Sequence, residues 1–148
     1  MDCSVGRLDK ASEGLLLLTN DSEWAARVTA PETHLDKTYH VQIAAQPDPE
    51  IIKSLLRGVK ADDGDVLHAK RTRILRAGEK NCWLEIILDE GKNRQIRRML
   101  AAFDIEVLRL LRTAIGPLQL GNLAKGTFRT LTKSEKQLLD RAISRRSA

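Results

Sequence analysis

The sequence predicts an α+β domain, built as a mixed, largely antiparallel sheet with flanking helices. Residues 36–45 alternate apolar and polar side chains, which is the period of a half-buried strand. Residues 81–91 are expected to form another strand, with Trp83, Glu85 and Ile87 on one face and Leu84, Ile86 and Leu88 on the other. Residues 92–103 instead repeat apolar side chains at the i, i+3, i+4, i+7 spacing of a helix. The expected order, strand-helix-strand-helix-strand-strand-helix-strand-helix, is typical of an α+β domain whose sheet is largely antiparallel.

The first two expected elements lie close to the amino terminus. Residues 14–20 hold four consecutive leucines between turn-like ends and are expected to form a short strand that is buried on both faces. Residues 22–30 are expected to form a short helix, with Ser22 as its N-cap and Pro31 as its end.

A strand and a second helix follow. In the strand over residues 36–45, Tyr39, Val41 and Ile43 share one face, which is expected to be the buried one. Residues 47–59 are expected to form a helix with proline at its start and Gly58 at its end.

The second half of the chain continues the same mixture. The expected elements are a turn over 62–65, strands over 66–77 and 81–91, the helix over 92–103, a strand over 105–120 that is broken at Gly116 and Pro117, and a final amphipathic helix over 132–146. No internal repeat or long linker divides the chain, so residues 1–148 are expected to form a single domain.

Composition narrows the class of protein. The chain carries a net charge of +5 with 42% hydrophobic and 30% charged residues, which is typical of a soluble protein and favours an anionic partner such as nucleic acid. Two Trp, one Tyr and two Phe are too few for an open platform of stacked bases.

Two cysteines indicate no disulfide framework and no zinc cluster, and Cys82 is expected to be a buried thiol in a reducing, cytoplasmic compartment. The apolar runs are too short for a membrane span.

Three stretches carry residues that can do chemistry: "GRLD" at 6–9, "KTY" at 37–39 and "EGKNRQIRRM" at 90–99. Taken alone, each has an ordinary alternative. An Arg and an Asp around a Leu can form a surface ion pair, a strand tyrosine can be core, and a basic helix start can be a solvated face, although it also favours phosphate. The residues by themselves therefore indicate a basic α+β domain that binds nucleic acid.

The four motifs together identify a family more specifically than any single motif does. "VGRLDKASEGLLLLTND", "KTYHVQI", "EGKNRQIRRM" and "LRLLRTAIGPLQLGNLAKGTFRTLT" occur in the order and approximate spacing of the RsuA-type pseudouridine synthases. The chain closely resembles this family, whose members isomerise uridine to pseudouridine in bacterial ribosomal RNA. The resemblance runs from about residue 5 to about residue 139, and the later motifs look more like the members that modify large-subunit RNA.

The resemblance implies an active site. Asp9, in "GRLD", matches the family's catalytic nucleophile, and Tyr39 matches the tyrosine that stacks on the target uracil. Arg97, in "QIR", matches the basic residue that pairs with the aspartate, and Leu110 matches the apolar residue that packs on the tyrosine and the base. The expected phosphate contacts are Arg7, Lys92, Arg94, Arg98 and Arg112.

The implied reaction breaks the N1–C1′ bond of uridine, turns the uracil and rejoins it through C5. The reaction transfers no outside group and changes no oxidation state, so neither a cofactor nor a metal is expected. A carboxylate can attack C1′ or C6, or help to remove the C2′ proton, and the sequence does not choose among these roles. The target base must leave its stack, so base flipping is expected.

One departure from the family is expected to matter. Family members carry a further segment before "GRLD" that contributes strands to the catalytic sheet, and many carry an S4-type RNA-binding domain before it. Without those strands the sheet is expected to have an exposed edge, open to self-association or to a partner chain. The alternative to an active enzyme is therefore a truncated, non-catalytic RNA-binding remnant. Ribosomal RNA is the expected partner on either interpretation.

Overall fold

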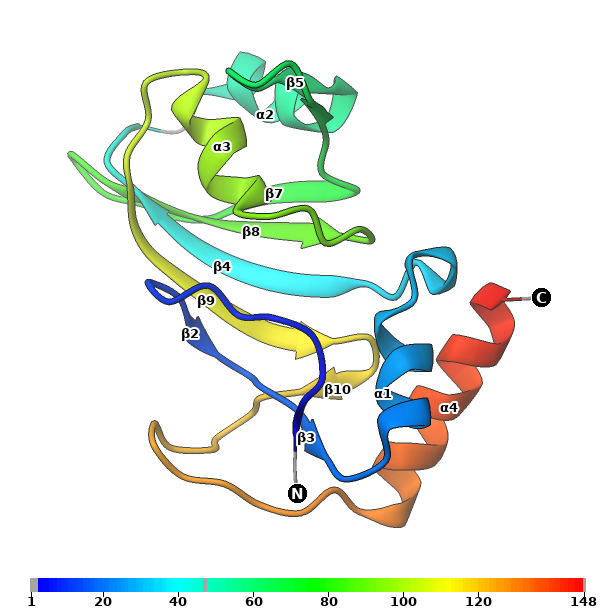
Figure 1. Ribbon diagram of the computed structural model, residues 1–148. Helices are drawn as coiled ribbons and strands as arrows, with labels where there is room; N and C mark the ends of the chain where they lie inside the picture. The colour runs from blue at the N-terminus through cyan, green and yellow to red at the C-terminus, as the bar shows by residue number, and fades with distance from the viewer. Residues whose placement is uncertain (1–2, 47, 148) are drawn as a thin grey trace.

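The computed structural model describes residues 3–46 and 48–147 (Figure 1). Pro47, at the expected start of the second helix, lies outside these ranges. The helices are α1 (Ser22–Thr29), α2 (Pro49–Arg57), α3 (Gln95–Ala101) and α4 (Lys133–Ser147), with a 3₁₀ turn at Pro31–Thr33. The strands are β1 (Cys3–Ser4), β2 (Glu13–Gly14), β3 (Leu18–Thr19), β4 (Lys37–Ile43), β5 (Val59–Lys60), β6 (Val66–Leu67), β7 (Arg71–Ala77), β8 (Cys82–Leu88), β9 (Val107–Ile115) and β10 (Leu118–Gln119).

A six-stranded sheet forms the centre of the molecule. Its strands lie in the order β10-β9-β4-β8-β7, and β2 pairs with β9 outside this path. All pairs are antiparallel except β2 with β9, which is parallel. The prediction of a mixed, largely antiparallel sheet with flanking helices is therefore confirmed. The edge strand β7 carries Arg71, Arg73 and Arg76, and charged edge strands disfavour pairing with another chain.

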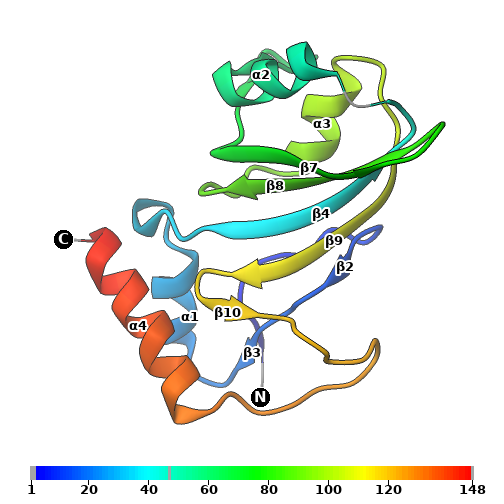
Figure 2. The same cartoon turned by 180° about the vertical axis from the view of Figure 1, so that it is seen from behind.

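The sheet has a separate hydrophobic core at each end (Figures 1 and 2). Under α2 and α3, alternate residues of β8 (Cys82, Leu84, Ile86 and Leu88) pack with Val41, Met99 and Leu100. At the other end, α1 and α4 enclose Trp24, Val28, Leu139 and Ile143 together with residues that come from the amino-terminal segment. Strand β4 contributes Val41 and Ile43 to the first core. Strand β9 contributes Leu110 to the first core and Ile115 to the second, so it connects the two (Figure 1).

The helix ends follow the capping rules with one correction. The N-cap of α1 is Asp21, whose carboxylate accepts from the amide of Trp24, so the expected cap at Ser22 is wrong by one residue. Helix α2 is capped by Asp48 and ends at Gly58, as predicted. Before α4, Thr132 and Glu135 exchange side-chain to backbone hydrogen bonds as a capping box, and the Arg129 guanidinium lowers the pKa of Glu135 to about 2.

The leucine run is the main difference between the expected and the observed fold. Leu15 and Leu17 are buried, but Leu16 and Leu18 are 44% and 60% exposed, so the run is buried on one side only. The reason is that β2 pairs with β9 on a single side and the chain then leaves the sheet to pair β3 with β1. Four identical residues carry no period, so the sequence could not show which of them face the core.

Other elements are shorter or split. The expected strand over 66–77 is divided into β6 and β7, because the chain between them connects two different sheets. Helix α3 begins at Gln95 rather than at residue 92, since Arg94 has a left-handed backbone with φ of 49°. Residues 92–94 therefore form a loop in front of the helix.

Gly14 gives the first testable prediction. Its φ is +109°, and a Cβ atom at this position would lie 2.2 Å from the carbonyl oxygen of Arg112. Gly64 has φ of +90° with no atom within 4 Å of the corresponding position. Gly64→Ala should therefore cost only the backbone strain, about 1–2 kcal/mol. Gly14→Ala should cost clearly more, because it also forces β2 away from β9.

Chemical denaturation of both variants measures the difference. Equal losses in the two variants would contradict the close contact between β2 and β9.

Candidate active site

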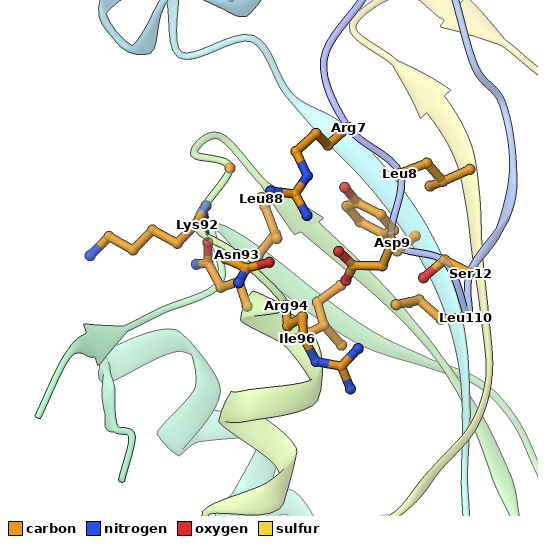
Figure 3. Close-up of a pocket in the computed structure, with 13 residues that line it drawn as sticks. Arg7, Leu8, Asp9, Ser12, Leu88, Lys92, Asn93, Arg94, Ile96 and Leu110 are labelled. Carbon is orange, nitrogen blue, oxygen red and sulfur yellow. Dashed lines mark hydrogen bonds between the residues drawn. The ribbon is translucent and has the colours of Figure 1, made fainter. Parts of the chain in front are cut away.

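A cleft lies at the middle of the sheet, between the loop before β2, the strands β4 and β9, and the loop before α3 (Figure 3). It encloses a cavity of about 150 Å³, a size that holds one benzene-like ring. The lining residues are Arg7, Leu8, Asp9, Ser12, Tyr39, Leu88, Gly91, Lys92, Asn93, Arg94, Gln95, Ile96 and Leu110. Six of the nine residues expected at the site therefore line one cavity, although they come from four separate parts of the chain.

Asp9 supplies the carboxylate of the cleft. Figure 3 shows its side chain directed into the cavity, toward the loop that carries Asn93 and Arg94. The amide of Ser12 donates to the backbone carbonyl of Asp9 over 2.8 Å, which closes a turn just after it. Within residues 3–46 and 48–147, no cationic nitrogen pairs with the Asp9 carboxylate at 4.0 Å or less. The carboxylate is thus left open to the cavity.

The neighbours of Tyr39 on β9 are placed by an irregularity in the sheet. The register between β4 and β9 shifts between Thr38 and Tyr39, so that Thr38 pairs with Ala114 and Tyr39 with Arg112. Thr113 is the extra residue, and bulges of this kind re-aim side chains. Without the shift Tyr39 would lie opposite Thr113, whose side chain points to the other face of the sheet. The bulge in β9 therefore puts Leu110 and Arg112 on the face of Tyr39, whose own register with β8 is regular.

The phenol of Tyr39 lies in a mostly dry environment. Burial raises the pKa of Tyr39, the positive charge of Arg112 acts against this rise, and the negative charge of Asp9 adds to it. The side chain is therefore a neutral phenol at physiological pH. Leu110, 4% exposed, lines the same cavity beside it. A flat aromatic ring and a buried leucine form an apolar surface on which a planar base can stack.

Three cationic side chains line the same cleft. Arg7 comes from the loop that carries Asp9, and Lys92 and Arg94 come from the loop before α3. This second loop is held by Gln95, which is 3% exposed and donates to the carbonyl of His68 and to the carboxylate of Glu90, at 3.1 and 2.8 Å. Its side-chain oxygen also accepts from the amide of Lys92. These bonds fix the positions from which the two cations extend.

Three expected site residues do not line the cavity. Arg97 reaches the Asp9 loop but not its carboxylate, because its Nη2 donates to the carbonyl of Ala11 over 2.9 Å. Arg98 pairs with Asp63 and Asp65 at 2.8 and 3.1 Å, so its charge is already used within the protein. Arg112 is 4% exposed and donates to the backbone carbonyls of Arg7 and Leu15. Neither Arg98 nor Arg112 lines the cavity, and their expected role as phosphate contacts stays a prediction.

The structure also adds residues that the motifs did not single out. Ser12, Asn93 and Gln95 line the cavity, and the Oγ of Ser12 is buried without a hydrogen-bond partner among the described residues. Serine, asparagine and glutamine are common in loops, so nothing in their spacing distinguished them. Among the described residues, no group of three or more His, Cys, Asp or Glu side chains could hold a metal ion. In the same part of the chain, none of the helices is both long and apolar enough to cross a membrane.

Comparison with known proteins identifies the family. Residues 3–102 match the sequence model described as RNA pseudouridylate synthase. The chain belongs to the RNA pseudouridylate synthase family. The match includes the loop of Asp9, the whole of β4 with Tyr39, and the loop before α3, so all of the cavity except Leu110 falls within it.

Individual relatives support the same assignment. An RNA pseudouridine synthase of Rickettsia bellii (strain RML369-C) is 42% identical over 130 residues, which are 88% of this chain and 56% of that protein. Ribosomal large subunit pseudouridine synthase E of Xanthomonas campestris pv. campestris is 39% identical over 140 residues, which are 85% of this chain and 75% of that protein. A crystal structure of a pseudouridylate synthase superposes with a TM-score of 0.80 at 31% identity, covering 93% of this chain and 59% of the other.

The chain spans about half the length of most of the curated relatives it matches.

Tyr39 allows a direct test of the electrostatics of the site, because it is the single tyrosine of the chain. Asp9 raises the pKa of Tyr39, so Asp9→Asn should lower that pKa relative to the wild-type protein. Ultraviolet absorbance of the phenolate, followed against pH, reports this residue alone among tyrosines. Asp62→Asn, in an exposed turn, removes a carboxylate elsewhere and should leave the titration unchanged. An unchanged pKa in Asp9→Asn would mean that the carboxylate and the phenol do not share the cleft.

Proposed function

We propose that this chain isomerises a uridine of ribosomal RNA to pseudouridine, with Asp9 as the nucleophile and with the target base flipped into the cleft. The observation that carries the proposal is that Asp9, Tyr39 and Leu110 line one ring-sized cavity with three cationic side chains around it. Membership of the RNA pseudouridylate synthase family supports the chemistry. The relative from Xanthomonas, named as a large-subunit enzyme, supports large-subunit RNA as the substrate.

The proposed reaction needs a carboxylate and a surface that holds the base, both of which the cleft provides. The N1–C1′ bond breaks, the uracil turns, and a C5–C1′ bond forms, after which the proton of C5 is lost and N1 gains one. Asp9 acts as the nucleophile during this exchange, at C1′ or at C6, and the bond that it forms breaks again before the product leaves, which returns the free carboxylate. An open carboxylate directed into a small cavity fits this role, because it is not weakened by an ion pair. The reaction is an isomerisation, so it needs no oxidant, no reductant and no group from another molecule.

The remaining residues bind and orient the base. The ring of Tyr39 stacks on the flipped uracil, and Leu110 packs against both. Base extrusion costs a few kcal/mol, and stacking on an aromatic ring recovers about 1–3 kcal/mol of it. Arg7, Lys92 and Arg94 contact the phosphates next to the target nucleotide, which positions the RNA without reading its sequence. Arg97 holds the Asp9 loop through the carbonyl of Ala11.

Asp9→Asn tests the catalytic role. The variant should form no detectable pseudouridine, because the amide is not a nucleophile, while its affinity for RNA should stay the same or rise slightly as a negative charge near the phosphates is lost. Pseudouridine mapping of ribosomal RNA after incubation with each protein measures the product. Asp62→Asn is the matched control and should remain active.

Product formation by Asp9→Asn would refute the proposal. RNA binding by the wild-type chain with no product under any condition would instead favour the non-catalytic remnant.

Lys92 tests the phosphate contacts. With three cations near the RNA backbone, the logarithm of the binding constant should fall with the logarithm of salt concentration at a slope of about −2 for single-stranded RNA. Lys92→Gln should make this slope shallower by about 0.7, since one counterion fewer is released. Lys53→Gln, on the exposed side of α2, should leave the slope unchanged. Equal slopes in the wild-type protein and Lys92→Gln would remove Lys92 from the RNA-binding surface.

A further inference from the structure

One buried guanidinium joins the two ends of the loop that carries Asp9. The Nε of Arg112 donates to the carbonyl of Leu15 over 2.9 Å, and its Nη1 donates to the carbonyl of Arg7 over 3.2 Å. Arg7 and Leu15 lie on either side of Asp9 in the sequence, so both flanks of the loop are bound to the same planar group. The planar fork of an arginine sets the separation and direction of its acceptors, which the single ammonium of a lysine cannot do.

The backbone of Arg112 holds the same segment. Gly14 lies opposite Arg112 in the parallel pairing of β2 with β9, and the amide of Leu15 donates to the carbonyl of Arg112 over 2.9 Å. The absence of a side chain at Gly14 allows this approach, as its φ and the contact distance above indicate. The loop is thus attached to β9 by one residue, through both main chain and side chain.

Arg112 is also the neighbour of Tyr39 across the sheet. The bulge at Thr38 and Tyr39 makes the two residues direct partners on one face, and the charge of Arg112 acts on the phenol. A side-chain hydrogen bond with Arg112 also acts on the phenol and lowers the pKa of Tyr39. A buried guanidinium is costly unless it is well bonded, and the partners of this one are Tyr39 and the two carbonyls of the Asp9 loop. Arg112 therefore bonds to the loop on one side and to Tyr39 on the other.

We propose that Arg112 is a positioning residue, which holds the Asp9 loop against β9 and thereby keeps Asp9 and Tyr39 at a fixed separation across the cleft. The inference rests on the proposed function for its catalytic consequence, but the geometry can be tested without activity. It replaces the role of phosphate contact that the sequence indicated for this residue. It also explains why an arginine, whose chemistry suits phosphate, is withdrawn from solvent here.

Two substitutions separate the two parts of this role. Arg112→Lys keeps a positive charge but loses the planar guanidinium, and Arg112→Gln loses both. In each variant kcat should fall by about 100-fold, as expected when a catalytic group is misplaced by about 1 Å, while the RNA dissociation constant should change by no more than about threefold. Amide hydrogen exchange over residues 7–15 should become faster in both, because the loop is no longer bound at its two ends.

The titration of Tyr39 gives a readout that a purely structural role would not move in this pattern. Asp9 and Arg112 are the charged groups that act on the phenol. In Arg112→Gln the pKa of Tyr39 should rise above the wild-type value, because the opposing positive charge is gone. In Arg112→Lys it should stay close to the wild-type value. Arg71→Gln, on the exposed edge strand β7, is the control and should change neither kcat nor the titration.

Each other outcome counts against the proposal. A shallower salt dependence of RNA binding with unchanged kcat at saturating RNA would make Arg112 a phosphate contact. Unchanged exchange over residues 7–15 in both variants would remove the loop attachment, and loss of folding in both would assign Arg112 to the core alone. If the wild-type protein forms no pseudouridine, the proposed function fails, whereas hydrogen exchange and the Tyr39 titration still decide the role of Arg112.

Discussion

The site depends on the attachment of a short segment, residues 13–15, to strand β9. This is the parallel pairing in the sheet, and it is made possible by a glycine that lets the two backbones approach closely. The loop that carries Asp9 has little regular structure of its own, so the attachment of β2 to β9 determines where the loop lies. Tyr39 and Leu110 are carried by β4 and β9 themselves. A single strand therefore relates the carboxylate to the surface on which a base would stack.

The two carboxylates of the amino-terminal segment are held differently. Asp9 keeps its carboxylate open, while Glu13, four residues later, forms a bidentate ion pair with Arg109 at 2.7 and 3.0 Å, which lowers the pKa of Glu13. Arginines next to the loop use carbonyl oxygens as acceptors, those of Ala11, Arg7 and Leu15. These bonds hold the backbone without neutralising the Asp9 carboxylate. A direct ion pair would hold the carboxylate more firmly but would also make it a weaker nucleophile.

Much of the fold could be predicted from the sequence, because β4, β8 and the helices show clear periods. The leucine run could not, since four equal residues do not indicate which side is buried. The gathering of Asp9, Tyr39 and Leu110 in one cleft followed from a family resemblance and not from spacing, as each lies far from the others in the chain. The arginines were the least predictable. Sequence shows where a guanidinium starts, but the direction it takes is decided by acceptors such as Asp63 or the carbonyl of Leu15, which only the fold brings near.

The two separate cores have a mechanical consequence. The amino-terminal segment around the Asp9 loop is anchored through Val5, Leu15 and Leu17 in one core, whereas the loop with Lys92 and Arg94 leads into α3, which is anchored in the other. Leu110 belongs to the core of α3, and Tyr39 packs against it, so the stacking surface and the loop with Lys92 and Arg94 share one support. A small change in the twist of β4 and β9 would therefore shift the Asp9 carboxylate relative to all of these groups together. The width of the cleft is thus set by how the two cores lie against each other.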